Sequence, residues 1–224
     1  MLWIDKNSLM KLNIAKNNEK EVLVEMVNSY GETGTVKGIM VNNPKFRIFD
    51  SFDLLLKAPN GKDIRLDILL DRPSDKFNTF CALNVKDVVT NDTLYENVNR
   101  EVFLTSNFKN FNRNDEKNKE WLNDEGTKFM LNNIGQYVEF TPSKESIERG
   151  YRPVKGILKC SYNTTMGNNS KIIQILMDGN PSNTIAHIRL PKEYTITATS
   201  FVTGKTDSIN YVSKEKEVED QFVR

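Results

Sequence analysis

The chain has 224 residues, of which 38% are hydrophobic and 27% are charged, and this mixture predicts a folded rather than a disordered protein. Its 31 basic residues are balanced by 30 acidic ones. A protein that binds a polyanion usually has more basic than acidic residues. The balanced charge of this chain therefore argues against nucleic-acid binding and favours protein–protein association. No run of 18 apolar residues and no signal-peptide pattern occurs, so we expect a cytoplasmic protein.

A short helix followed by strands is predicted for the first hundred residues. The segment Ser8–Asn18 has Leu9 and Leu12 at helical spacing. An apolar run over 52–57 and an alternating run over 63–71 flank an Asn-Gly turn, which is the strongest short-range signal for a hairpin. The other strands expected here are Glu21–Val27, Thr35–Val41, Phe46–Phe49 and Thr79–Val85.

The following segment, 101–133, is polar and predicted to be partly helical. A helix capped by Asn114 would run to Asn132, with Gly126 interrupting it. Aromatic and basic residues also interleave here, and single-strand nucleic-acid-binding proteins use such residues to stack on bases and to hold the backbone. Intramolecular packing, a protein-contact loop and nucleic-acid binding are the three interpretations. The candidate binding residues are Phe103, Phe108, Lys109, Phe111, Arg113, Lys117 and Trp121.

Strands dominate again in the last part of the chain. Thr195, Thr197 and Thr199 alternate with apolar residues, a pattern that favours a strand. A thin apolar stripe over Asp207–Arg224 predicts a C-terminal helix or tail. The expected strands are Tyr137–Thr141, Val154–Tyr162, Lys171–Met177, Thr184–Leu190 and Tyr194–Val202.

Four short blocks recur in the same order in both halves of the chain, which indicates an internal duplication. Chance similarity between short strand segments is the alternative. The matched blocks are 24–26 with 138–140, 36–40 with 154–158, 68–71 with 175–178, and 78–80 with 183–185. The predicted regions are an N-terminal extension (1–19), a first β module (20–100), a linker (101–133), a second β module (134–205) and a C-terminal helix or tail (206–224).

We therefore expect a mainly β protein with two tandem small β-barrel or sandwich modules, a partly helical linker and short terminal helices. The stretch Gly135–Phe140, with Arg149-Gly150 and Pro153-Val154, resembles the last two strands of cold-shock domains, which have the OB fold. The resemblance covers a small part of the chain and lacks the aromatic nucleic-acid-binding motifs of those domains. It implies an OB-like barrel rather than a sandwich and implies no function.

The inventory of reactive residues is poor. The single histidine, His187, shares a strand face with Ile185 and Arg189 and has few partners for catalysis or metal binding. Cys81 and Cys160 are expected to be reduced thiols. No Walker loop, dinucleotide-binding glycine motif or Gly-x-Ser-x-Gly elbow occurs, so we predict a non-enzyme without cofactors.

Three acidic residues at four-residue spacing deserve a separate interpretation. Asp63, Asp67 and Asp71 fall on one face of a predicted strand, and carboxylates in a row can recruit a hard cation. Arg65 interleaves with them, however, as on an ordinary solvated strand face. We therefore predict no metal site.

The leading functional hypothesis is a non-enzymatic structural or assembly protein, without a membrane association. Its β modules would dock onto copies of the same chain or onto neighbouring subunits, which predicts a homo-oligomer. Abundant Asn and scarce Ala indicate an AT-rich genome, and this composition suggests a bacteriophage particle as the setting. The alternatives are a single-stranded nucleic-acid-binding protein with OB-like barrels and a protein inhibitor of a host enzyme.

Overall fold

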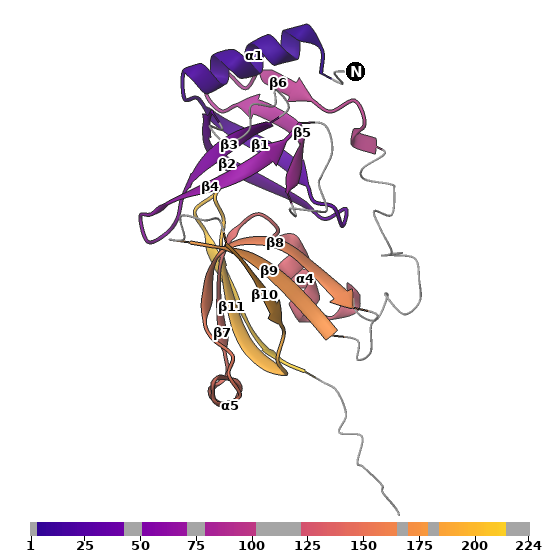
Figure 1. The fold of residues 1–224 in the computed structure, drawn as a ribbon, viewed down its shortest axis with the longest axis vertical. Coiled ribbons are helices and arrows are strands. Elements are labelled where there is room, and N and C mark those ends of the chain that lie inside the picture. The colour runs from indigo at the N-terminus through magenta and orange to yellow at the C-terminus, as the bar shows by residue number, and fades with distance from the viewer. Residues whose placement is uncertain are drawn as a thin grey trace, which may run out of the picture.

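The computed structural model describes residues 4–42, 51–70, 79–101, 122–164, 170–178 and 184–213. The protein is mainly β, with a closed five-stranded barrel, a second sheet of six strands and a few short helices (Figure 1). The prediction of a mainly β protein is confirmed.

The barrel is formed by the first half of the chain. Its strands β1 to β4 pair antiparallel in sequence order, and β5 closes the barrel by pairing antiparallel with β1. The contact of β4 with β5 is parallel and has two residue pairs, while β6 is added to the outer side of β5. The strands are β1 (Glu21–Val27), β2 (Thr33–Val41), β3 (Ser51–Lys57), β4 (Asp63–Leu69), β5 (Phe80–Asp87) and β6 (Thr93–Glu96).

The predicted hairpin shows why the barrel forms. Ile64, Leu66 and Ile68 alternate along β4 and are at most 5% exposed, whereas Arg65 between them is exposed. Because successive side chains of a strand point to opposite faces, this alternation buries one face of the sheet in the barrel interior. The hairpin prediction is confirmed.

Helix α1 (Lys6–Asn17) lies on the barrel beside β6 (Figure 1). Asp5 begins it, since its carboxylate accepts hydrogen bonds from the main-chain N–H groups of residues 7 and 8, at 2.9 and 3.0 Å. Leu12 and Ala15 are buried beneath the helix. The predicted N-terminal helix is confirmed.

The second sheet has the strand order β10-β9-β8-β7-β11-β12, with every neighbouring pair antiparallel. Within the described residues β10 and β12 are its two edges. Helix α4 (Glu125–Asn132) packs against β8 and β12, and α5 (Lys144–Glu148) lies between β7 and β8 in the chain. The strands are β7 (Tyr137–Pro142), β8 (Val154–Thr164), β9 (Ser170–Met177), β10 (Ile185–Arg189), β11 (Glu193–Thr199) and β12 (Thr206–Val212).

Two helix predictions need correction. The helix predicted from Asp207 onward is wrong over residues 207–212, which form strand β12 paired with β11. Their apolar residues fit a strand because Ile209 lies opposite Ile196 in the ladder. The helix predicted over 114–132 is confirmed only as α4, and Gly126 lies inside it rather than interrupting it. Residues 114–121 and the predicted strand 46–49 lie outside the described residues.

The matched sequence blocks fall on corresponding strands only in part. They lie on β1 and β7, β2 and β8, and at β4 and β9, and both β1–β2 and β7–β8 are antiparallel pairs. The last block ends on the first residue of β5 in the barrel, which closes on β1, and on the first residue of β10 in the second sheet, which is an edge strand within the described residues. The internal duplication therefore stays a prediction.

Barrel and second sheet share one hydrophobic core, which contains Phe52 and Phe80 of the barrel and Phe140 of the second sheet. Two glycines allow the barrel and the second sheet to approach each other closely. A Cβ on Gly34 in β2 would collide with the carbonyl group of residue 134, and one on Gly135, whose φ is +81°, would collide with the Met26 side chain. The two sheets are therefore packed against each other directly.

Candidate functional site

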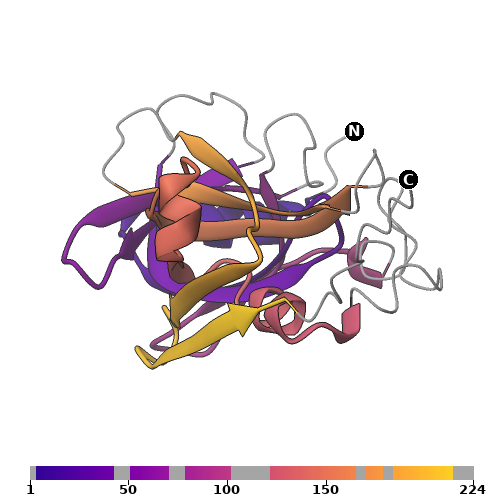
Figure 2. The same ribbon diagram turned by 90° about the horizontal axis from the view of Figure 1, so that it is seen from below.

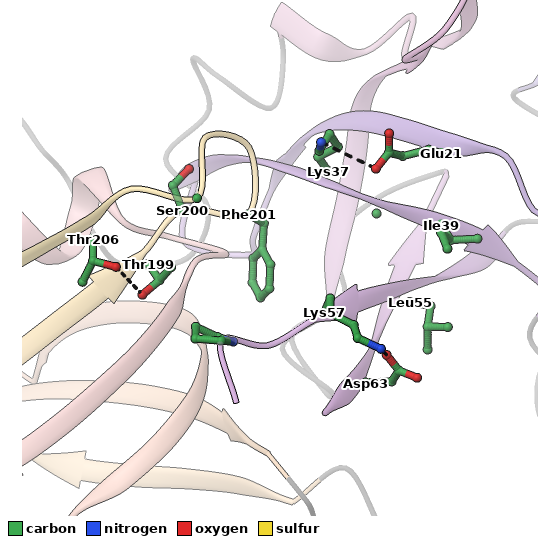
Figure 3. Close-up of a pocket in the computed structure, with 13 residues that line it drawn as sticks. Glu21, Lys37, Ile39, Leu55, Lys57, Asp63, Thr199, Ser200, Phe201 and Thr206 are labelled. Atoms are coloured by element: carbon green, nitrogen blue, oxygen red, sulfur yellow. Dashed lines mark hydrogen bonds and ion pairs between the residues drawn. The ribbon is translucent and has the colours of Figure 1, made fainter. Parts of the chain in front are cut away.

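A groove of about 670 Å³ lies between the barrel and the turn that joins β11 to β12 (Figure 3). One wall comes from β1 to β4, and the other comes from residues 199–206. Three apolar side chains line it: Ile39, which is 38% exposed, and the half-buried Leu55 and Phe201. Solvent-accessible apolar groups in a concave surface are a common feature of binding sites.

Gln136 holds the two walls of the groove together. Its Nε2 donates to the carbonyl oxygen of Thr35 in β2 at 2.8 Å, and its Oε1 accepts from the N–H of Phe201 at 2.9 Å. The Gln136 side chain is buried, so both bonds are shielded from water. These two bonds connect the turn that contains Phe201 to the barrel, and Phe201 also packs against the hydrophobic core.

Strands β2 and β3 diverge at the groove. Their ladder has three residue pairs and ends at Ile39–Leu55, so it does not reach the next pair that would exchange hydrogen bonds in this register, Lys37 and Lys57. The N–H of Met40 donates to the carbonyl of residue 20 at 2.9 Å, and bonding directions alternate along a strand. Even-numbered residues of β2 therefore bond to β1, and the main chain of Lys37 faces the gap.

The same alternation applies on the opposite side of the gap. The N–H of Ala58 donates to the carbonyl of Lys62 at 2.9 Å, so the main chain of Lys57 faces away from β4 and toward β2. Both Lys37 and Lys57 line the groove. Among the residues that the structure describes, β2 and β3 do not pair with each other at these two residues, although Lys37 lies opposite Leu23 of β1 and Lys57 lies opposite Asp63 of β4.

The charged side chains of the groove are paired with one another. Lys37 Nζ lies 3.5 Å from a carboxylate oxygen of Glu21, and Lys57 Nζ lies 3.2 Å from one of Asp63 (Figure 3). Each lysine of the lining thus has an acidic partner. This balance suits a polypeptide of mixed or low charge better than a phosphate backbone, which attracts surplus cations.

A buried polar cluster joins the second sheet to the barrel. Asn28 Nδ2 donates to Glu32 Oε2 at 2.7 Å and to the carbonyl of Lys159 in β8 at 2.9 Å. The N–H of Ser161 donates to the same carboxylate oxygen at 3.1 Å. All four residues are at most 4% exposed. Because buried hydrogen bonds are costly to leave unmade, this cluster fixes the two sheets relative to each other.

Lys159 is a buried cation at this junction. It occupies a β-bulge, where the register of β8 against β9 shifts between residues 158 and 160. Its Nζ lies 4.4 Å from the centroid of the Phe80 ring. Burial lowers the pKa of Lys159 to about 8, and the charge of Asp67 opposes this shift. At 4% exposed, the side chain is closed to a substrate, although its pKa would suit a catalytic base.

A second polar network fixes strand β12. The Tyr211 hydroxyl donates to Asp124 Oδ2, which also lies 2.9 Å from Lys171 Nζ, while Asp124 Oδ1 accepts from the N–H of Thr127 at 2.9 Å. The Tyr211 ring stacks on Tyr194 at a centroid distance of 4.9 Å. Burial alone would raise the pKa of Asp124, but the hydrogen bonds outweigh it and hold this pKa below its usual value.

The seven binding residues predicted from the sequence, Phe103, Phe108, Lys109, Phe111, Arg113, Lys117 and Trp121, lie outside the described residues. Their role stays a prediction. His187 is exposed, and its Nδ1 lies 3.3 Å from Gln174 Nε2. Cys81 and Cys160 are both buried and are not joined in a disulfide. Over the described part of the chain, no three His, Cys, Asp or Glu side chains are grouped to hold a metal ion.

The groove was not predicted from the sequence. Its two walls lie more than a hundred positions apart, in the barrel and in the turn after β11, and the repeated block 36–40, which contributes to the lining, carries no binding signal. Comparison with protein-family models, with curated proteins and with solved structures finds no match to this chain. None of the helices within the described ranges has the length and apolarity needed to cross a membrane.

Proposed function

We propose that the protein is a non-enzymatic docking protein that binds an extended polypeptide segment of a neighbouring subunit in the groove between the barrel and the β11–β12 turn. The observation that carries this proposal is the divergence of β2 and β3. It leaves the main chain of Lys37 and Lys57 facing a groove with apolar side chains. An added strand gains main-chain hydrogen bonds at such a position, and side-chain pockets supply the specificity.

The chemistry of the groove defines the bound segment. Its main chain would bond to Lys37 and Lys57, and an apolar side chain would pack against Phe201, Ile39 and Leu55. The ion pairs at the rim favour a segment with little net charge. The buried clamp at Gln136 keeps the walls in place before binding, which reduces the entropy lost on association.

Selection of peptides from a random display library tests the proposal, with a matched pair of variants at one position. Lys57→Pro removes the N–H that faces the groove, whereas Lys57→Ala keeps it and removes the same ion pair with Asp63. We expect selected peptides to bind the wild type and Lys57→Ala similarly. Lys57→Pro should weaken binding about tenfold, the value of one hydrogen bond.

Phe201→Ala tests the apolar wall of the groove in the same experiment and should also weaken the selected peptides. The proposal fails if the library yields no binder. It also fails if the selected peptides bind Lys57→Pro and Phe201→Ala as tightly as the wild type.

The other functional hypotheses remain predictions. The paired charges of the groove give no support there to single-stranded nucleic-acid binding, and the residues proposed for that role lie outside the described ranges. Assembly into a bacteriophage particle rests on composition alone. Titration with a labelled oligonucleotide at two salt concentrations distinguishes the nucleic-acid hypothesis, because phosphate contacts produce a steep salt dependence.

A further inference from the structure

Strand β12 ends the second sheet with an open row of hydrogen-bonding groups. The N–H of residue 213 donates to the carbonyl of residue 192 at 2.8 Å, and the N–H of residue 200 donates to the carbonyl of residue 205 at 2.9 Å. By alternation, the odd-numbered residues of β12 bond to β11. The outward main-chain groups belong to Thr206, Ser208, Asn210 and Val212, and β12 pairs only with β11 within the described residues.

The edge strands β6 and β10 are better protected against pairing with another strand. Strand β6 has four residues and lies beside α1, with Lys11 Nζ donating to the carbonyl of Thr93 at 3.2 Å. Strand β10 has five residues, and the residues directed outward include His187 and Arg189. Short length, cover and charge are the usual means by which proteins block edge pairing. Strand β12 has seven residues, with neither proline nor lysine.

Strand β12 is also held in one position. The Tyr211 hydroxyl is bonded to Asp124 at the start of α4, and Lys171 of β9 completes this network. Because Tyr211 also stacks on Tyr194 of β11, the strand is fixed on its inner face, while no described strand pairs with its outer edge. A strand that is already ordered loses little further entropy when a partner strand is added.

We propose that β12 pairs antiparallel with β12 of a second copy of this chain, about a two-fold axis at Ile209. In this register Thr206 lies opposite the second copy's Val212, and Ser208 lies opposite the second copy's Asn210. All four outward-facing residues of each strand then form main-chain hydrogen bonds, and the two six-stranded sheets become one. Val212, which is 62% exposed, becomes covered at the edge.

The strand is complementary to itself, and this identifies a second copy as the occupant. Asp207 is its only charged residue and lies opposite the second copy's Tyr211, so the two carboxylates are kept apart. The two Ile209 side chains meet at the axis. A two-fold axis at Ser208 or Asn210 would leave one outward residue of each strand without a partner. The pairing edge shares only Thr206 with the groove, which lies at the turn end of the β11–β12 hairpin.

Charge placed at the axis tests the proposal. Ser208→Lys with Asn210→Lys brings four ammonium groups together only if β12 pairs in the stated register. Light scattering after size exclusion should show a dimer for the wild type and a self-association weakened roughly a hundredfold or more in the variant. A matched control, Val202→Lys with Thr203→Lys, adds the same charge to the turn of the same hairpin and should remain dimeric.

Mixing two variants tests the register itself. Ser208→Glu with Asn210→Glu should also be monomeric, and an equimolar mixture with the lysine variant should form a heterodimer, since each lysine then faces a glutamate. Circular dichroism verifies that both variants are folded. A monomeric wild type, a dimer that survives the lysine substitutions, or a mixture that stays monomeric would each overturn the proposal.

Discussion

The barrel and the second sheet contain similar strands but differ in whether their edge strands pair with each other. In the barrel, β5 returns to β1, and the short β6 beside α1 is the one strand added to it within the described part of the chain. The second sheet stays open, and β12 lies at its margin (Figure 2). Closure satisfies the main-chain groups of a sheet internally, whereas an open edge keeps them available to a partner. The barrel therefore supports the fold, and the contacts that we propose lie where closure is incomplete.

The same comparison holds inside the barrel. Strands β1 and β2 pair along their full length, but β2 and β3 pair over three residues and then separate at the groove. The buried amide of Gln136 bonds to β2 beside this opening. Within the described residues, both proposed contact surfaces thus consist of strand segments that lack a second neighbouring strand, held in place by buried or half-buried polar side chains.

The largest expected effect comes from the core that both regions share. Phe52 of the barrel is fully buried, and Phe52→Ala should lower the free energy of unfolding by about 3–5 kcal/mol through lost burial and a cavity. Since the core is continuous, Phe140→Ala in the second sheet should shift the same single transition. Urea denaturation followed by circular dichroism measures both. Two separate transitions, each shifted by only one of the substitutions, would show that the regions fold independently.

A smaller change in the free energy of unfolding, this time an increase, is expected when Lys159, at the junction of the two sheets, is replaced or deprotonated. Burial lowers the pKa of Lys159 from 10.5 to about 8, so between these pH values the unfolded chain binds more protons than the folded one. The free energy of unfolding should therefore rise from pH 8 to 10.5, by about 3 kcal/mol. Lys159→Met removes the buried cation and should stabilise the protein by about 2 kcal/mol at pH 7.

Denaturation of the wild type and of Lys159→Met at a series of pH values tests this prediction, because other titrating groups cancel in the difference. Lys155→Met is the matched control. Lys155 lies on the same strand with an exposed side chain, and its ion pair with Glu139 at 2.7 Å contributes little at the surface. A difference between wild type and Lys159→Met that does not change between pH 8 and 10.5 would contradict the pKa shift.

The smallest effect is expected at the network that holds β12. Asp124→Asn keeps a good helix-capping residue but weakens the bonds to Lys171 and Tyr211, which should cost about 1–2 kcal/mol. The pKa of Asp124 is lowered, so its contribution is complete above the ordinary pKa of 3.8 and is lost as the pH falls through the folded-state pKa. The stabilities of wild type and variant should therefore converge only as the pH falls below 3.8.

Hydrogen exchange separates this local effect from a global one. Amides of β12 that bond to β11 should exchange faster in Asp124→Asn than in the wild type, whereas those of the barrel should change less. The control is Asp5→Asn, at the exposed cap of α1 on the far side of the barrel, which should leave β12 unchanged. Equal acceleration in both sheets would mean that the network does not act on β12 specifically.

Much of the fold was predictable because alternation is a local property. The strand at Glu21–Val27 has the predicted bounds, and the hairpin around Gly61 is as expected. The C-terminal helix was predicted wrongly because a few apolar residues in a short segment fit the 3.6-residue period of a helix and the two-residue period of a strand equally well. Ile209 faces Ile196 only after the chain turns at Gly204, whose φ of +70° permits the hairpin.

The groove could not be predicted in the same way. Its apolar residues Ile39 and Leu55 are ordinary strand residues, and Gln136 lies in the stretch that resembles cold-shock domains, a resemblance that implied a fold and no contact with the groove. Its function as a clamp depends on Thr35 and Phe201, which are far from it in the sequence. Separation along the chain, rather than unusual residue chemistry, concealed the site.

The amino-acid sequence alone determined most of the strands, their buried faces and the balance of charge, but neither β6 nor β12. Tertiary structure alone decided that one sheet closes and the other stays open. Closure depends on whether strands far apart in the sequence, such as β1 and β5, pair in register, and no local sequence pattern predicts that pairing. The surfaces available for binding follow from this choice, because only a strand without a second neighbour keeps its main-chain groups free for a partner.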